Sequence, residues 1–305
     1  MSLRDDLQRI ADVRVDEPMA RHTTFGIGGP ADYFVTARDE EALLRLVQSA
    51  RRAQAPVFLL GSGSNILVGD AGIRGVVLEN KANAVAEPER HGDIVRLRGH
   101  AGAPLARLAR WTARNGLLGL EWAAGIPGTL GGAVVYNAGA YGGCLADVLT
   151  SIRVLERDGS ERSLDARDLG LAYRSSDFTR GLLAGRVILD LTFTLQLGES
   201  AVALAKVEEL ERKRKTSTPR GRNAGSVFKN PDQHPAWWLI DKVGLRGHRI
   251  GDAQISDKHT NYFLNLADAQ ARDVAALMDL AQRRVRETFG LELEAEVAFV
   301  GEGLS

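Results

Sequence analysis

The spacing of hydrophobic and polar residues predicts a chain of short helices and strands. In the helical segments hydrophobic residues recur every three to four positions and charged residues fill the opposite face, as in 40–52. Helices are expected over 3–10, 40–52, about 105–111, 201–215 and 268–289, the last with Asp268 as its N-cap. Strands are expected over 31–35, 57–60, 75–78, 94–98, 151–156 and 186–197, with Asp158-Gly159 as a hairpin turn.

The pattern changes near Gly198, which predicts a domain boundary there. A helix dense in charge follows over 201–215, where the charges indicate a solvated face, and a second block runs from 236 onwards. The 305 residues leave room for two or three domains. Contents of 44% hydrophobic and 26% charged residues are typical of globular proteins with a packed core.

Charge and cysteine content exclude several classes of protein. Lys and Arg number 39, as do Asp and Glu, so there is no net basic charge to favour a nucleic acid partner. Cys144 is the single cysteine, which excludes an intrachain disulfide and a cysteine metal cage, and no metal is expected. Residues 1–18 do not resemble a signal peptide, and no apolar run approaches membrane-span length. A cytoplasmic protein without membrane insertion is therefore expected.

The stretch 125–143, GIPGTLGGAVVYNAGAYGG, holds seven glycines. Glycine costs backbone entropy on folding, so this density needs a reason. One reason is a turn whose successive N–H groups form an anion-binding concavity suited to a pyrophosphate. The other is a tightly turned structural loop, and composition alone leaves both open.

A second glycine loop, GSGSNILVGD, spans 61–70. Gly61 and Gly63 fit the first two glycines of the dinucleotide fingerprint, but Ile66 occupies the third place and no long helix is expected next. The loop also lacks the Gly-Lys-Ser/Thr of a P-loop. Its serines and asparagine could donate to phosphate oxygens or could cap an ordinary turn.

Seven segments in order resemble the UDP-N-acetylenolpyruvoylglucosamine reductase family. Each motif alone is modest, but together they span nearly the whole chain. They are TTFGIGGPADYF (23–34), LLGSGSNILV (59–68), GLEWAAGIPGTLGGAVVYNAGAYGG (119–143), YRSSDF (173–178), NAGSVFKNP (223–231), AWWLIDKVGLRGHRIGDAQISDKHTNYFLN (236–265) and LEAEV (293–297).

The resemblance implies an α+β fold of the vanillyl-alcohol-oxidase/PCMH flavoprotein type. Residues 1–198 would bind FAD noncovalently in lobes of about 1–75 and 76–198, and 199–305 would bind the substrate, with the C-terminal strand returning to the active site. NADPH would reduce the flavin. UDP-N-acetylglucosamine enolpyruvate would then be reduced to UDP-N-acetylmuramate, a peptidoglycan precursor, by a protein expected to be a monomer.

The resemblance also implies catalytic residues. Hydride passes from flavin N5 to the β carbon of the enolpyruvyl group, Ser226 protonates the α carbon, and Arg174 and Glu296 stabilise the charge that develops between these steps. Read without the family, Ser226 is a turn serine and Arg174 a surface residue. Glu296 would belong to a half-exposed strand over 291–297. Ala295 stands where the family usually has proline.

Cofactor and substrate contacts follow from the same match. Asn230 corresponds to a contact of the substrate diphosphate, His259 lines the nucleotide pocket, and Lys229 is a weaker phosphate candidate. The short segment between Arg174 and Ser226 resembles the branch of the family that lacks an inserted substrate lid. The expected FAD contacts are Gly61, Ser62, Gly63, Ser64, Asn65, Gly125, Ile126, Pro127, Gly128, Thr129, Gly131 and Gly132.

Two other functions remain open at this point. The same fold could carry an FAD-dependent oxidase of a sugar or alcohol, which oxygen would reoxidise quickly. A nucleotide-binding module without catalysis would purify as a colourless protein that takes up no flavin.

Overall fold

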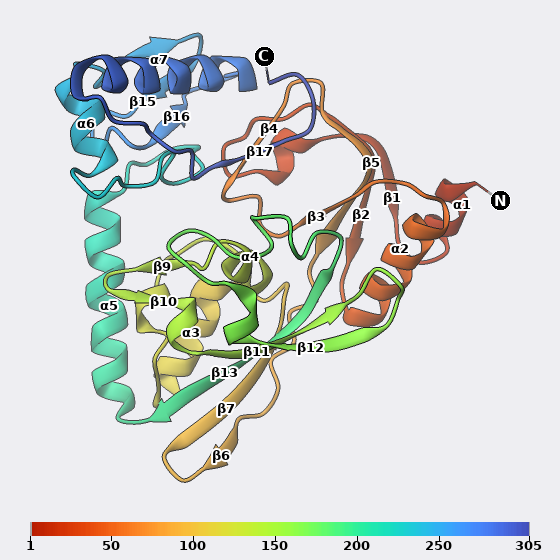
Figure 1. Ribbon diagram of the computed structural model, residues 1–305. Helices are drawn as coiled ribbons and strands as arrows, with labels where there is room; N and C mark the ends of the chain where they lie inside the picture. The colour runs from red at the N-terminus through yellow and green to blue at the C-terminus, as the bar shows by residue number, and fades with distance from the viewer. Residues whose placement is uncertain (1, 305) are drawn as a thin grey trace. The chain divides into compact units, whose positions relative to one another are not determined.

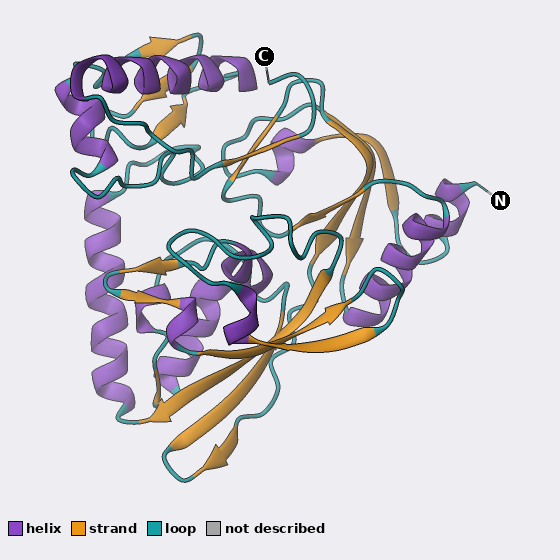
Figure 2. Ribbon diagram, in the orientation of Figure 1, coloured by secondary structure: helices purple, strands orange, loops and turns teal. Residues whose placement is uncertain are grey.

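The computed structural model describes residues 2–304 and mixes helices with strands, so the α+β prediction is confirmed (Figures 1 and 2). The chain divides into two compact units, each made of segments distant in sequence. Unit 1 comprises the residues up to Asp12, Val35–Gly61 and Leu78–Arg214. Unit 2 comprises Val13–Phe34, Ser62–Val77 and the residues from Lys215 onwards. The functional division at residue 198 stays a prediction.

Unit 1 is built around a six-stranded antiparallel sheet of order β12-β11-β13-β7-β6, in which β8 also pairs with β13. The helices of this unit are α1 (Leu3–Gln8), α2 (Glu40–Arg52), α3 (Leu105–Arg114) and α4 (Leu130–Val135), with 3₁₀ turns η2 (Glu121–Ala123), η3 (Leu145–Asp147) and η4 (Ala166–Leu169). The strands are β3 (Val57–Leu60), β6 (Glu89–His91), β7 (Ile94–His100), β8 (Leu117–Leu118), β9 (Gly139–Ala140), β10 (Gly143–Cys144), β11 (Leu149–Leu155), β12 (Glu161–Asp165) and β13 (Val187–Leu197).

The largest core of unit 1 lies against this sheet. Phe193 and Leu191 of β13 pack with Leu97 of β7, Leu130 of α4 and Leu108 of α3, all nearly inaccessible to water. Hydrophobic residues alternate along β7 because only one of its faces is buried. This packing fixes α3 and α4, and therefore the glycine-rich loop between them.

An arginine with three carboxylate partners ties α2 to the sheet. Arg153 of β11 donates to Asp190 (2.8 Å), Glu161 (2.5 Å) and Glu40 (2.5 Å). The Asp190 side chain is only 3% exposed, so this ion pair is largely buried on the aspartate side.

Unit 2 contains a three-stranded sheet of order β14-β15-β16, and α7 packs against it (Figure 1). Phe228 and Phe263 meet edge to face in its core, 6.1 Å between ring centroids. Its elements are β1 (Val13–Pro18), η1 (Met19–His22), β4 (Ile66–Val68), α6 (Ala236–Lys242), β14 (Arg249–Ile250), β15 (Ala253–Ile255), β16 (Phe263–Asn265), α7 (Ala271–Phe289) and β17 (Ala298–Val300).

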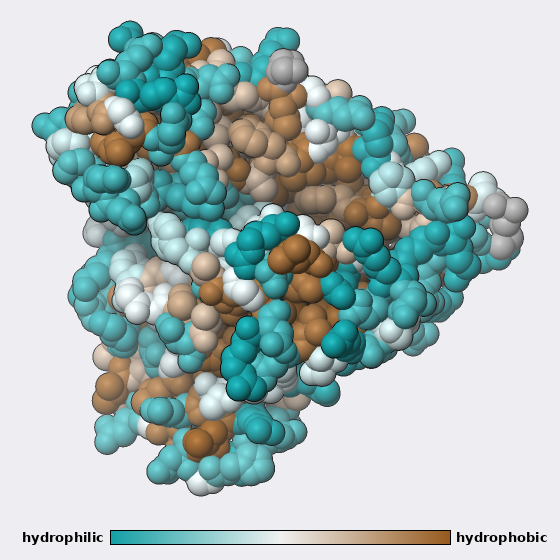
Figure 3. Space-filling model, viewed as in Figure 1, coloured by the Kyte–Doolittle hydropathy of each residue, from teal (hydrophilic) through white to brown (hydrophobic). Residues whose placement is uncertain are grey.

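Three elements contribute residues to both units: β2 (Pro30–Ala37), β5 (Ile73–Asn80) and α5 (Ser200–Ser217). Strands β2 and β5 are neighbours in a four-stranded sheet of order β1-β2-β5-β3. Helix α5 buries a single stripe of Ala203, Val207 and Leu210, and its charged residues lie elsewhere. Hydrophilic residues cover most of the face drawn in Figure 3.

Most predicted elements are present, but the predicted N-cap of the last helix was wrong. Helix α7 begins at Ala271 with Gln270 as its N-cap, because Gln270 and Asp273 form a reciprocal capping box; Asp268 is not the cap. The half-exposed strand considered over 291–297 is absent, since the described strand β17 starts at Ala298. Within residues 2–304, no helix is long and apolar enough to cross a membrane.

Candidate active site

The two glycine loops meet in unit 1 at Gly61 and Thr129. A Cβ on Gly61 would lie 2.5 Å from Thr129 Oγ1, so the approach needs a glycine. Thr129 is the N-cap of α4, and its hydroxyl accepts from the N–H of Gly132 at 3.5 Å. The N–H of Thr129 itself, in a buried residue, has no acceptor within residues 2–304. Buried amides are seldom left unpaired, so this one suits an external acceptor such as a phosphate oxygen.

The first loop continues into unit 2 as a turn with several open amides, meaning backbone N–H groups that have no acceptor among the described residues. Gly63 is buried with φ of +62°, and a Cβ there would lie 2.1 Å from the carbonyl oxygen of His22. In the described part of the chain, the N–H groups of Ser62, Gly63 and Asn65 have no acceptor. Ser62 and Ser64 pair their hydroxyls at 3.2 Å. Such a cluster of bare amides binds anions, so the residues present fit the pyrophosphate of a dinucleotide.

Other predicted cofactor residues hold the shape of the second loop. The N–H of Gly131 already donates to Ala101 (2.8 Å) and that of Ile126 to Ala123 (3.1 Å). The carbonyl of Gly128 accepts from the helix α3 N–H at Leu105, 3.0 Å away. Residues Leu130–Val135 form α4, so the stretch predicted as a loop is partly helical. The remaining members of this loop are Gly125, at φ +70°, and the exposed Pro127.

Ser226 lies on an extended segment between two others of unit 2. It pairs with Tyr262 in an antiparallel bridge on one side. On the other side the N–H of Glu296 donates to Val227, 2.8 Å away. Ser226 is half-buried, and its hydroxyl has no hydrogen-bond partner among the described residues. The hydroxyl is therefore available to a ligand.

Asn65 joins the first glycine loop to Glu296. Its side-chain amide donates to the Glu296 carbonyl at 3.1 Å, and its own carbonyl accepts from Ala298 at 3.0 Å. Unit 2 thus brings together three predicted site residues from distant parts of the sequence: Asn65, Ser226 and Glu296. The Asn65 side chain positions the Glu296 backbone in this arrangement.

Three predicted substrate residues also belong to unit 2. Asn230 caps α6 by accepting from the N–H of Ala236 at 3.0 Å. Lys229 pairs with Glu294 at 2.5 Å. His259 meets Tyr262 edge to face, 4.9 Å between centroids, and its buried Nδ1 has no partner in residues 2–304. Burial lowers the pKa of the His259 imidazole, so the ring is neutral near pH 7.

Arg174 lies in a strained part of unit 1. Its φ is +51°, and Asn137 and Tyr141 also have positive φ, at 40° and 54°. Such residues cluster at functional sites, where the surrounding structure enforces the strain. The guanidinium of Arg174 donates to the Gly139 carbonyl at 2.9 Å, while buried Asn137 holds the preceding turn by donating to Ala172 at 3.0 Å.

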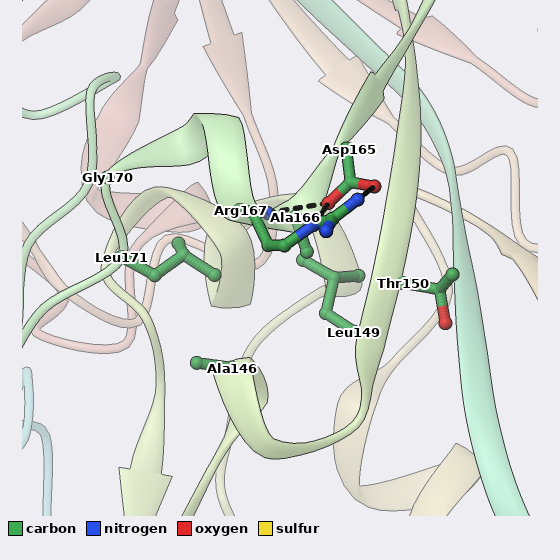
Figure 4. A pocket seen from close by; sticks show the side chains of 8 residues that line it. All are labelled: Ala146, Leu149, Thr150, Asp165, Ala166, Arg167, Gly170 and Leu171. Atoms are coloured by element: carbon green, nitrogen blue, oxygen red, sulfur yellow. Dashed lines mark hydrogen bonds and ion pairs between the residues drawn. The ribbon is translucent and has the colours of Figure 1, made fainter.

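A separate open pocket of about 600 Å³ lies on unit 1 and contains none of the predicted site residues (Figure 4). Its carboxylate, Asp165, is paired with Arg167, which lowers the pKa of Asp165 to about 2. Across residues 2–304, no cluster of His, Cys, Asp and Glu could hold a metal ion. The lining residues are Ala146, Leu149, Thr150, Asp165, Ala166, Arg167, Gly170 and Leu171.

Comparison with known proteins places this geometry in a family. The family model "UDP-N-acetylenolpyruvoylglucosamine reductase, C-terminal domain" matches residues 216–300, and the model "FAD binding domain" matches 31–165. A UDP-N-acetylenolpyruvoylglucosamine reductase from Lachnoclostridium phytofermentans is 44% identical over 95% of this chain and 93% of its own. The chain belongs to the UDP-N-acetylenolpyruvoylglucosamine reductase family.

Two further members of the reductase family are also similar to this chain. A second relative of that name, from Symbiobacterium thermophilum, is 42% identical over 98% of this chain and 96% of its own. The crystal structure of the reductase from Thermus caldophilus superposes with a TM-score of 0.77 at 34% identity, covering 95% of this chain and all of that one. The predicted family, oxidoreductase class and FAD-binding domain are therefore confirmed.

Two residues of this reductase-family chain were missed at the sequence level. Asn137 supports the turn that precedes Arg174. Thr24, in the quoted segment TTFGIGG, connects the first glycine loop to the segment that carries Ser226. The motif drew attention to the segment, but no local pattern indicates a partner 199 residues away.

Proposed function

We propose that this protein reduces UDP-N-acetylglucosamine enolpyruvate to UDP-N-acetylmuramate with NADPH, in the synthesis of peptidoglycan precursors in the cytoplasm. Family membership supports the reaction class. The observation that carries the proposal is the setting of Ser226, whose half-buried side chain has no hydrogen-bond partner among the described residues and whose neighbour Val227 accepts from the N–H of Glu296.

The proposed reaction needs one hydride and one proton. When bound, reduced FAD would supply the hydride to the β carbon of the carbon–carbon double bond. Ser226 holds the proton on Oγ and delivers it to the α carbon. A serine hydroxyl is a weak acid, but the species that it protonates is strongly basic, so the transfer runs downhill. The saturated lactyl ether is the product.

Arg174 and Glu296 are proposed to manage charge. The Arg174 guanidinium offers a planar pair of donors to the substrate carboxylate, where negative charge accumulates as the double bond is reduced. Glu296 shares that charge by hydrogen bonding or relays a proton to Ser226. The proposal assigns Asn230 and, more weakly, Lys229 to the diphosphate and His259 to the nucleotide.

The N–H groups of Ser62 and Gly63 in unit 2 are proposed to bind the FAD pyrophosphate noncovalently, and the N–H of Thr129 in unit 1 is a further proposed cofactor contact. The fit rests on their lack of acceptors within residues 2–304 and on the close approaches at Gly61 and Gly63. We propose NADPH as the reductant.

Ser226→Ala tests the assignment by separating the two half-reactions. Stopped-flow absorbance would follow flavin reduction by NADPH and then reoxidation by UDP-N-acetylglucosamine enolpyruvate. We expect reduction at the wild-type rate and reoxidation slowed by at least about 100-fold, because only the second step needs the proton. Ser160→Ala is the matched control, since that hydroxyl bonds Asp158 in the exposed β11–β12 hairpin.

Two outcomes would contradict the proposal. Equal slowing of both half-reactions in Ser226→Ala would remove the proton-donor role. The reduced flavin of the wild type could instead fail to be reoxidised by the UDP-sugar and react rapidly with oxygen during turnover of an alcohol. The protein would then be an oxidase.

A further inference from the structure

Thr24 connects two segments that are far apart in the sequence. Its N–H donates to the Gly63 carbonyl (3.0 Å), and its carbonyl accepts from the N–H of Asn223 (3.1 Å). Its hydroxyl donates to the Asn223 carbonyl at 2.7 Å and also lies 3.4 Å from the Gly63 carbonyl. One residue of unit 2 therefore contacts both the turn with open amides and the start of the segment that leads to Ser226.

The side of Thr24 that faces the glycine loop is closely packed. Gly63 packs so closely on the His22 carbonyl that a Cβ would lie 2.1 Å from it. His22 is fixed in turn by Glu17, 2.9 Å from its Nε2, and by stacking on Phe34 with centroids 4.0 Å apart. Burial would raise the pKa of Glu17, but the hydrogen bond from His22 and the neighbouring positive charges outweigh it and keep this carboxyl ionised.

The other side of Thr24 leads to Ser226 in three residues. Asn223 shapes the turn by accepting from the N–H of Gly225 at 3.0 Å, where φ is +80°. Ser226 then enters its bridge with Tyr262. The two hydrogen bonds between Thr24 and Asn223 thus set where this turn begins, and the bond from the hydroxyl can be removed without touching the backbone.

We propose that Thr24 is a positioning residue that couples occupancy of the Ser62–Asn65 turn by the FAD pyrophosphate to the order of the Asn223–Ser226 turn. This deepens the proposed function, on which it rests. A ligand that immobilises Gly63 also immobilises Thr24, and the Thr24 hydroxyl passes that restriction to Asn223. Coupling of this kind needs no change in mean structure, because ordering one turn lowers the entropy cost of ordering the other.

Thr24→Val tests the coupling, because Thr24 is exposed and valine keeps the shape and both backbone bonds. Thr24→Ser restores the hydroxyl. Thr36→Val is the matched control, since the Thr36 hydroxyl donates to the Glu79 side chain at 3.1 Å. Hydrogen–deuterium exchange of residues 221–228 would be measured on apoprotein and on protein saturated with FAD, alongside the single-turnover rates.

We expect FAD to slow hydrogen–deuterium exchange in residues 221–228 by about tenfold or more in the wild type, in Thr24→Ser and in Thr36→Val. In Thr24→Val, FAD should slow that exchange by less than about threefold. Thr24→Val should also slow reoxidation by the enolpyruvyl sugar more than reduction by NADPH. Undiminished protection in Thr24→Val, or a loss that Thr24→Ser does not restore, would overturn the coupling. Full protection in a wild type that ignores the enolpyruvyl sugar would overturn the proposed reaction and support the coupling.

Discussion

Gly63→Ala is the substitution for which the structure makes the sharpest prediction. Gly63 has φ of +62°, and a Cβ would lie 2.1 Å from the carbonyl oxygen of His22 and 2.9 Å from Cα of Thr23. Both contacts are with backbone, which cannot rotate aside as a side chain would. The turn itself must therefore move.

The cost has two parts. A side chain at left-handed φ costs about 1–2 kcal/mol whatever its surroundings. Relief of the contact requires a shift of about 1 Å or more, because carbon atoms in contact normally lie about 3.5 Å or more from their neighbours. A displacement of that size at a positioned amide cluster would weaken FAD binding by at least about tenfold, or about 1.4 kcal/mol.

Gly92→Ala separates these two parts. Gly92 has φ of +63°, and a Cβ there would meet nothing within 4 Å. The midpoint temperature of thermal unfolding should fall in both apoproteins because of the backbone strain that they share. It should fall further in Gly63→Ala, where the steric contact adds to that strain. FAD titration by fluorescence should be altered in Gly63→Ala only. Equal FAD affinity in the two variants would refute the steric reasoning.

Two further predictions concern stability. Arg153→Met leaves the carboxylates of Glu40, Glu161 and Asp190 without their shared cation. The free energy of unfolding measured in urea should fall by about 3 kcal/mol. This is the lower end of the range for a broken buried pair, because the Arg153 side chain is 27% exposed. His259 has a folded-state pKa below its ordinary 6.5, so the unfolded chain takes up the proton first and stability falls as pH drops below about 6.5. His259→Gln should reduce that fall, measured as unfolding free energy between pH 7 and 5.

Each of these predictions has a matched control. Arg167→Met removes an ion pair whose arginine is 88% exposed, and it should leave urea unfolding unchanged. A loss for Arg153→Met no larger than for Arg167→Met would show that its network adds nothing. Exposed His91→Gln controls for the histidine, and an identical pH dependence in wild type and His259→Gln would contradict the role assigned to burial.

The local hydrophobic pattern was sufficient to predict the bounds of an element where one of its faces is buried. Helix α2 and strand β3 begin and end where the hydrophobic spacing predicted, because the spacing records which side of the backbone avoids water. The start of α7 was missed because the N-cap depends on a side chain in the first turn that reaches back to it. Here the Asp273 side chain accepts from the N–H of Gln270, whereas composition favoured Asp268 as the cap.

The same distinction between local pattern and tertiary contact applies to the candidate site. By itself the sequence determined the family and predicted the candidate residues, because the glycine density and the seven ordered motifs can be read without knowledge of any contact. Only the tertiary structure decided which of them meet: β4 pairs with β17 although more than 200 residues separate them, and this pairing seats Asn65 beside Glu296. Periodicity reports the burial of one residue at a time, whereas the choice of partner depends on the packing of the whole unit.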